Sequence, residues 1–372
     1  MIKVLELFAG IGACSKALTN LGKEHEIVDA VEIDKYAIKS FNAIHNTKFD
    51  PQGITKWDKD IRCDLIMHRS PCQDFSLAGK QAGGDKDSGT RSSLMYETLR
   101  IVEKLRPKYV IWENVKNLLS KKHRHNFDSY LENMRKLGYA SSFQVLNAKD
   151  YGIPQNRERV FTVSIRDDHK HSVIERLDDF YFEFPKPMPL EKKLKDILEK
   201  DVDEKYYLSE KAISCFMSDG TGKYPRRERF LQNMNRKNQD IGNSVTTRAG
   251  SRATDNFVKI ITANKTGYDL ATDGDGVDLT YPKSTTRRGR VGHGVSKTLP
   301  TSDSQGVLDG YRIRKLTPKE CWRLMGFDDV DFEKAAKVNS NTQLYKQAGN
   351  SIVVNVIEAI LNEIEGLKGD EK

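Results

Sequence analysis

The chain is predicted to be a doubly wound α/β protein with a second, smaller, loop-rich domain, and three observations carry this prediction. Short apolar runs alternate with segments of helical spacing from residue 1 to about residue 166, which is typical of βα units around a parallel sheet. Three prolines at every second position of 185–189 then end the alternation. Residues 210–312 are rich in Gly, Thr, Asn and Arg, a composition typical of loops and short strands.

The elements of the first part can be assigned in chain order. Strands are expected at 4–8, 27–31, 64–67, 109–112 and 160–163, all parallel. Helical spacing predicts helices over 36–41 and 94–102. Ligands bind at the carboxyl ends of such strands, so the residues that follow each run are the candidates for a site.

The later elements follow from prolines and caps. The alternating prolines forbid a helix and favour an extended connector, which predicts a domain boundary near 184–189. Thr317 is expected to cap a helix with Pro318 at its first position and Glu320 at its third. A last helix over 352–360, after a turn at 348–351, is expected to return and cover the first domain.

Composition narrows the class of protein. The chain has 372 residues and a net charge of +8, and its five cysteines form no C-x-x-C pair, so neither a disulfide framework nor a zinc or other metal site is expected. No apolar stretch is long enough to cross a membrane, and the amino-terminal run 1–6 contains charges, so no signal peptide is expected. We therefore expect a cytoplasmic protein.

The positive charge is concentrated in one segment. Residues 221–252 hold eight basic and two acidic residues. A solvated surface would explain such a run, but interleaved aromatic and amide side chains favour nucleic acid, since phosphates need cations and base edges need amides and guanidinium groups. Further arginines at 287, 288 and 290 are candidates for reading bases.

A glycine loop ends the first predicted strand. Gly10 and Gly12 of Phe8-Ala9-Gly10-Ile11-Gly12 would let the backbone approach a ligand closely. Glu32, at the end of the next strand, is placed to bind ribose hydroxyls. The pair predicts an adenosine cofactor, either NAD or S-adenosylmethionine. Ser15 in place of a third glycine counts against a dinucleotide.

Three further groups follow strand-like runs. Cys72 lies between Pro71 and Gln73 after the third run, where a thiol can serve as a nucleophile, although a single free Cys is most often an inert buried hydrophobe. Glu113 ends the fourth run and is a solvated group or an acid that protonates a ring nitrogen. Arg157 and Arg159 precede the fifth run and are expected to point the same way.

Taken in order, these motifs resemble the DNA cytosine-5 methyltransferases of the bacterial or phage type. The matching segments are FAGIG (8–12), PCQ (71–73), ENV (113–115), QNRER (155–159), the capped helix at 317 and QAGNS (347–351). The resemblance covers about 1–165 and 312–365. It implies a Rossmann-like methyltransferase domain, 1–185 completed by 312–372, and a hinge and target recognition domain over 190–311.

The resemblance also implies roles for residues. Cys72 would attack C6 of a flipped-out cytosine in duplex DNA, Glu113 would hold N3 and the exocyclic amine, and Arg159 and Arg157 would orient the base and the thiol. The S-adenosylmethionine site would be lined by Phe8, Gly10, Gly12, Glu32, Ile33, Ile54, Pro71, Leu94, Asn350 and Ser351. DNA contacts would come from Gln73, Ser76, Arg226, Arg227, Arg229, Arg248 and Arg252. A monomer acting at the bacterial nucleoid or in a phage-infected cell is expected, with a restriction endonuclease as a potential companion.

Two residues depart from the family pattern. Gly53 stands where an acid usually accepts from the adenine amino group, and Arg69 stands three residues before Cys72, where the family prefers a small residue. The Arg69 side chain could turn to solvent or phosphate, impair an enzyme that keeps its DNA binding, or pair with an acid-bearing relative of S-adenosylmethionine.

Three other functions compete with this one. A dehydrogenase would leave Pro-Cys-Gln without a role. A sequence-specific DNA-binding regulator without catalysis fits the two departures. A transfer-RNA methyltransferase would use the same chemistry, although a long basic recognition region favours duplex DNA.

Overall fold

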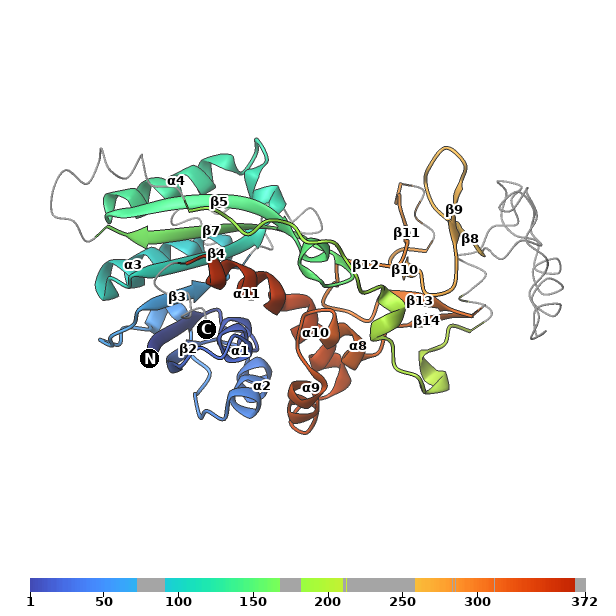
Figure 1. Ribbon diagram of the computed structural model, residues 1–372, viewed down its shortest axis with the longest axis horizontal. Coiled ribbons are helices and arrows are strands. Elements are labelled where there is room, and N and C mark those ends of the chain that lie inside the picture. Colours follow the sequence, from blue (N-terminus) through green and yellow to red (C-terminus); the bar gives the residue numbers. More distant parts are fainter. Residues whose placement is uncertain are drawn as a thin grey trace.

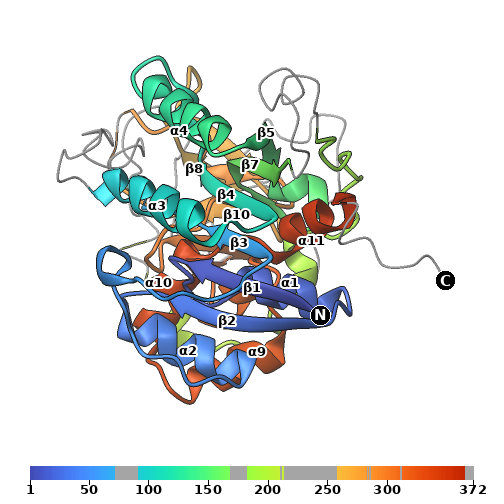
Figure 2. The ribbon, with the colours of Figure 1, turned by 90° about the vertical axis from the view of Figure 1, so that its left-hand side faces the viewer.

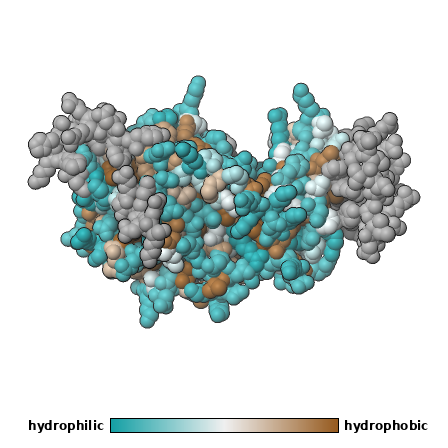
Figure 3. Space-filling view, in the orientation of Figure 1, coloured by the Kyte–Doolittle hydropathy of each residue, from teal (hydrophilic) through white to brown (hydrophobic). Residues whose placement is uncertain are grey.

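The computed structural model describes residues 1–71, 91–167, 182–209, 212, 258–282, 284, 286–310 and 312–364. Two lobes are visible in Figure 1, a larger one built around a central sheet and a smaller one built from short strands. Helices of the carboxyl-terminal part lie between them. The face shown in Figure 3 is mostly hydrophilic and is hollowed between the lobes. No helix within the described ranges is long and apolar enough to span a membrane.

A six-stranded sheet forms the centre of the larger lobe, with strand order β2-β1-β3-β4-β7-β5. Its strands are β1 (Ile2–Leu7), β2 (His25–Val31), β3 (Leu65–His68), β4 (Tyr109–Val115), β5 (Tyr139–Asn147) and β7 (Glu158–Arg166). The first four are parallel, as predicted. The parallel direction predicted for 160–163 is wrong, because β7 runs antiparallel to both β4 and β5. The short 148–157 connection from β5 allows this direction, whereas a parallel neighbour needs a longer crossover.

Helices cover both faces of this sheet, which confirms the doubly wound fold. They are α1 (Ala13–Asn20), α2 (Lys35–His45), α3 (Met95–Leu105), α4 (Arg124–Lys136) and α11 (Val354–Glu363). In Figure 2, α3 and α4 lie on one side of the sheet, and α1 and α11 lie on the other. Each side has its own buried apolar cluster. The last helix, α11, packs against α1, so the end of the described chain does return to the first domain as predicted.

Three further helices connect the lobes: α8 (Pro318–Arg323), α9 (Asp329–Ala336) and α10 (Asn341–Asn350). The predicted cap of α8 is confirmed, because Thr317 Oγ1 accepts from the Glu320 N–H (3.2 Å) and the Glu320 carboxylate accepts from the Thr317 N–H (2.8 Å). The turn predicted at 348–351 is instead largely helical, since α10 continues to Asn350.

The smaller lobe is built from strands, as its composition predicts. A hairpin of β8 (Val258–Ile261) and β9 (Tyr268–Ala271) stands beside a sheet with the order β11-β10-β13-β14. The sheet strands are β10 (Gly276–Asp278), β11 (Val291–Gly292), β13 (Gln305–Asp309) and β14 (Arg312–Lys315). One strand, β12 (Ser296–Lys297), instead pairs with β6 (Gln155–Asn156), which directly precedes β7 of the larger lobe.

Candidate active site

A buried carboxylate held by two arginines lies on the central strands of the large sheet. Glu113 is on β4 and is 1% exposed. Arg69 follows β3 and Arg159 is the second residue of β7, and these strands are the two neighbours of β4 in the sheet. The Arg69 Nε lies 3.0 Å from Glu113 Oε2, and the Arg159 Nε lies 3.0 Å from Glu113 Oε1. Each carboxylate oxygen therefore has its own guanidinium partner.

The position of Arg69 corrects one interpretation of the sequence. An Arg69 side chain turned to solvent or phosphate would be largely exposed, but it is 18% exposed and its Nε is paired with Glu113. The physical reason is the register of the sheet: His68 is paired with Trp112, so the next residue on each strand, Arg69 and Glu113, also lie beside each other.

Arg157 does not point the same way as Arg159, so that expectation is wrong. Its guanidinium is 2% exposed and donates to the carbonyl oxygens of Leu299 (3.3 Å), Gly349 (3.1 Å) and Ser351 (2.9 Å). The chain turns at Arg157, whose N–H donates to the Gln155 carbonyl. This turn breaks the period-two alternation that would have placed both arginines on one face.

The segment that leads to Cys72 is anchored on the strand that carries Glu113. The Trp112 Nε1–H donates to Ser70 Oγ (3.0 Å), and the Asn114 side-chain amide donates to the Ser70 carbonyl (3.4 Å). Pro71 follows Ser70, whereas Cys72, Gln73 and Ser76 lie outside the described residues. Asn114 was not singled out in the sequence, although it is the central residue of the ENV segment.

The glycine loop after β1 brings Gly10 next to Glu32. Gly10 has a φ of +57°, and no atom lies within 4 Å of the position that a Cβ would take. Its N–H donates to Glu32 Oε2 (3.1 Å). Glu32 is half-buried, and this burial raises the pKa of its carboxyl above the usual range. Gly12, with a φ of +82°, is needed for packing instead, since a Cβ there would lie 2.1 Å from His45 Nε2.

An apolar surface lies beside Glu32. Ile33 is 77% exposed, and the Cβ of any residue replacing Gly53 would lie 3.9 Å from its Cδ1 atom. The Gln52 N–H donates to the Glu32 carbonyl (2.9 Å), which holds the two segments together. Ile54 is buried in the core cluster against which Leu94 also packs.

A narrow cavity joins the glycine loop to Arg69. Its lining comes from β1 and the loop after it, the end of β3 and the end of α10, and it includes Phe8, Gly10, Arg69, Asn350, Ser351, His68 and Glu6. Four of the predicted cofactor residues are thus brought together with Arg69. Glu6 was missed, although a charge inside an apolar strand run was visible in the sequence. Its carboxylate accepts from the Ser15 N–H (2.9 Å), and burial raises its pKa to about 7.

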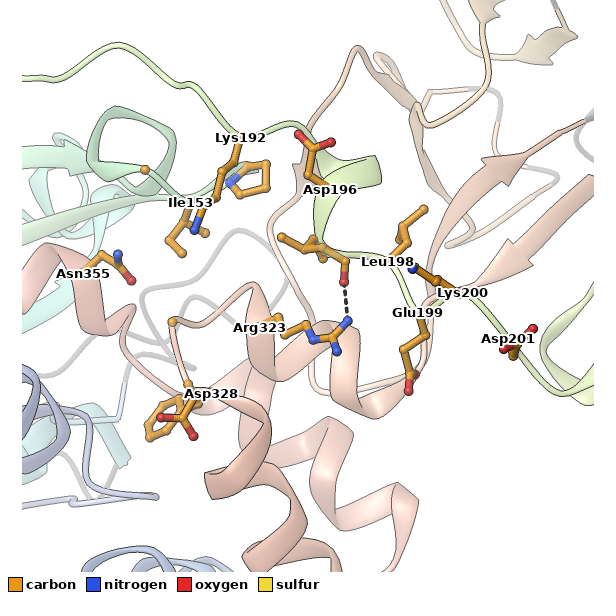
Figure 4. Close-up of a pocket in the computed structure, with 15 residues that line it drawn as sticks. Ile153, Lys192, Asp196, Leu198, Glu199, Lys200, Asp201, Arg323, Asp328 and Asn355 are labelled. Carbon is orange, nitrogen blue, oxygen red and sulfur yellow. Dashed lines mark hydrogen bonds between the residues drawn. The ribbon is translucent and has the colours of Figure 1, made fainter.

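A wider cavity of about 780 Å³ lies at the joint between the lobes and contains none of the predicted site residues. Figure 4 shows acidic and basic side chains around it, including Asp196, Lys200 and Arg323. Arg323 Nη1 donates across it to the Ile197 carbonyl (2.8 Å). With charges of both signs and a bond between its walls, this cavity is part of the connection between the lobes.

The arginines predicted to contact DNA are only partly described. Arg226, Arg227, Arg229, Arg248 and Arg252 lie outside the described residues. Arg290 cannot read bases as expected, because it is 1% exposed and donates to the carbonyls of Asp278, Thr280 and Tyr281. Arg287 is paired with Asp278 (2.7 Å).

Comparison with known proteins gives matches along nearly the whole chain. A family model described as C-5 cytosine-specific DNA methylase matches residues 2–366. The orphan methyltransferase M.SPBetaI of Bacillus phage SPbeta is 33% identical, over 98% of this chain and 97% of the phage protein. The type II methyltransferase M.HhaI of Haemophilus parahaemolyticus is 31% identical, over 98% of this chain and 94% of its own length.

Solved structures show the same fold at lower sequence identity. A putative DNA modification methyltransferase encoded within an Escherichia coli prophage superimposes with a TM-score of 0.60 at 21% identity, covering 99% of both chains. The Entamoeba histolytica methyltransferase EhMeth superimposes with a TM-score of 0.61 at 16% identity, covering 98% of this chain and 97% of its own.

Proposed function

The chain belongs to the C-5 cytosine-specific DNA methylase family and is a DNA methyltransferase, and from this premise we propose that it methylates C5 of a flipped-out cytosine in a specific duplex sequence through a covalent Cys72 adduct. The observation that carries the proposal is the buried Glu113 carboxylate, paired with Arg159 and lying on the strand that anchors Ser70, two residues before Cys72. The segment that leads to Cys72 and the proposed acid are thereby joined at neighbouring strands of the sheet.

Residues of the narrow cavity, together with the neighbouring Glu32 and Ile33, have the chemistry that S-adenosylmethionine needs. The open space at Gly10 admits a ligand close to the backbone, and Glu32 lies beside it to accept from ribose hydroxyls. The exposed Ile33 offers an apolar surface for adenine. Asn350 and Ser351 line the other end of the cavity, near Arg69. When bound, the cofactor supplies an electrophilic methyl group.

The protein groups activate the cytosine ring. A base inside the duplex cannot be reached on either face, so it must leave the stack. The Cys72 thiolate adds to C6 and forms the S–C6 bond, while Glu113 holds N3 and the exocyclic amine, so that electron density moves to C5. After C5 is methylated, the C5 proton passes to a water molecule and the C5–H electron pair forms the C5–C6 double bond as the S–C6 bond breaks. Cys72 leaves as the thiolate, and N3 returns its proton to Glu113. Arg159 orients Glu113 and the base throughout.

Arg157 would support the site from the cofactor side. Because its donors reach the Gly349 and Ser351 carbonyls, we assign it the positioning of the Asn350–Ser351 segment rather than contact with the base. Pro71 would fix the backbone between the cofactor and Cys72.

Duplex DNA is the proposed substrate, bound by a monomer in the hollow between the lobes, with the smaller lobe reading the sequence. The basic segment 221–252 fits the phosphate backbone. The similar phage protein is named an orphan methyltransferase and the Haemophilus protein a type II methyltransferase. A companion restriction endonuclease therefore stays a prediction.

Two measurements test this function. Bisulfite sequencing of DNA from cells that express the protein should reveal methylated cytosines in one sequence context, and an unmodified genome would favour the DNA-binding regulator instead. A duplex with 5-fluorocytosine at that position should be trapped covalently, because fluorine cannot leave C5 as a proton does. Cys72→Ala should abolish trapping while keeping duplex binding, and an adduct formed by this variant would refute the role of Cys72.

A further inference from the structure

We propose that Arg69 is a positioning residue for Glu113, a second guanidinium that fixes the carboxylate in the orientation required by the incoming cytosine. The inference rests on the proposed function, because it assigns Arg69 a part in the same reaction. Sequence alone offered three other interpretations of Arg69, and none of them included a bond to the acid.

The first argument is the symmetry of the contacts. Arg69 and Arg159 approach Glu113 from the strands on either side of β4, and each uses its Nε at 3.0 Å from a different oxygen. A carboxylate held at one oxygen can still rotate about its last torsion, which is broad for Glu. An ion pair at each oxygen favours one orientation of its plane. Arg69 therefore removes a freedom that Arg159 alone would leave.

The second argument is that Arg69 leaves Glu113 able to bind the base. A carboxylate has two oxygens with about four acceptor positions, and the two Nε contacts are ion pairs without hydrogen-bond geometry, so they leave acceptor positions on both oxygens. One oxygen can accept from the exocyclic amine while the other meets N3. Arg69 therefore orients the acid without occupying all of its acceptor positions, which predicts a supporting role rather than an obstructing one.

The third argument is charge and location. Glu113 is 1% exposed, and a carboxyl group at such a site requires polar or charged partners. Arg69 supplies one of the two positive charges from a side chain that is itself 18% exposed. Arg69 also lines the narrow cavity with Phe8 and Ser351. The contact thus lies between the proposed positions of the methyl donor and the base.

The test is a double-mutant cycle on the rate of covalent trapping. The substrate is a duplex with 5-fluorocytosine at the position that bisulfite sequencing identifies, in single-turnover conditions with S-adenosylmethionine. Arg69→Met keeps most of the side-chain length and removes the charge. It should slow trapping roughly 10- to 100-fold, the size of loss expected when a catalytic group is misplaced by about 1 Å. Arg69→Lys should recover part of the rate.

A positioning role is distinguished by repeating the Arg69→Met change in a protein that already carries Glu113→Gln. In Glu113→Gln, the change Arg69→Met should slow trapping by less than about twofold, because residues that act through one another are not additive. Equal losses in both backgrounds would overturn the inference. A trapping rate that Arg69→Met leaves unchanged would also overturn the inference. A rate that Arg69→Met raises would overturn it too, and would mean that Arg69 obstructs the site. Whether trapping depends on Cys72 is measured separately with Cys72→Ala. A failure of the proposed function can therefore be told apart from a failure of the role assigned to Arg69.

A base analogue provides a measurement that does not need the Glu113 variant. A 2-pyrimidinone at the target position lacks the exocyclic amine, so Arg69→Met should slow Cys72 addition to it less than addition to cytosine. Equal slowing on both bases would contradict a role through Glu113. The matched control is Arg124→Met, which removes an exposed arginine–carboxylate pair with Asp128 on α4 and should leave both rates unchanged.

Discussion

Replacing Gly53 with aspartate should strengthen the binding of S-adenosylmethionine, because the new carboxylate would accept a hydrogen bond from the adenine amino group. The backbone of Gly53 tolerates the change: its φ is −87° and its ψ is 135°, an extended conformation open to any residue. The added Cβ would meet only Ile33 Cδ1, at the ordinary contact distance of 3.9 Å. No strain opposes the new side chain.

The size of the effect follows from the surroundings. A hydrogen bond to a charged group contributes about 1.5–3 kcal/mol where water is excluded. Gly53 is half-buried and the neighbouring Ile33 is exposed, so water competes for the carboxylate. We therefore expect about 1 kcal/mol, which is roughly a fivefold lower dissociation constant.

Isothermal titration of S-adenosylmethionine into the two proteins measures this difference directly. Gly53→Ala is the matched control, because it adds the Cβ and changes the chain entropy without adding an acceptor. Thermal unfolding of the free proteins reports any change in stability from the aspartate at the cap of the Ile54–Lys56 turn. If Gly53→Asp and Gly53→Ala bind the cofactor equally, the placement of adenine beside Ile33 is wrong.

Three further predictions follow from other contacts. Gly10→Ala should weaken cofactor binding at least tenfold in titration, and it should lower the free energy of unfolding by only the roughly 1 kcal/mol that a left-handed residue costs. Gly12→Ala should instead lower the melting temperature, because its Cβ would collide with His45. Burial lowers the pKa of His68 to about 3, so the unfolded chain takes up a proton first as the pH falls below about 6.5, and this residue should cost about 2 kcal/mol of stability at pH 5. In urea unfolding, the difference in unfolding free energy between wild type and His68→Gln should shrink by that amount from pH 7 to pH 5. An unchanged difference would contradict the assignment. Arg157→Met should raise the KM for S-adenosylmethionine more than it lowers kcat, since its bonds fix the cofactor side, and a pure kcat effect would instead place it at the base.

Local sequence patterns predict many helices and strands of this protein, but they predict less well which strands pair and in which direction. The positions of Glu32 and Glu113 follow from where apolar runs end, and the cap at Thr317 follows from three side chains close in sequence. The antiparallel direction of β7 does not follow, because the pattern of a buried strand is the same in both directions. Strand β5 and helices α4, α9 and α10 were also missed, although α9 carries a cap that the sequence contains, with the Asp328 side chain accepting from the Asp331 N–H.

The arginines show the same limit at the site itself. Which way Arg157 points depends on a turn of one residue between β6 and β7, and alternation alone predicts the opposite face. The partner of Arg69 is 44 residues away in the chain and is set by the order of strands in the sheet. Contacts of this kind need the topology, which periodicity does not contain.

The pairing of β12 with β6 determines where the smaller lobe can be exchanged. Gln155 accepts from the Leu299 N–H (3.1 Å) and Arg157 donates to the Leu299 carbonyl, so the chain just after β12 is held on both sides by the larger lobe. A chimera that replaces the smaller lobe with that of a relative should therefore keep residues 296–299 of this chain, and it should import β10 and β13 together because these two strands pair. A chimera that also exchanges residues 296–299 would replace the anchor that connects the imported lobe to the strand of Arg159.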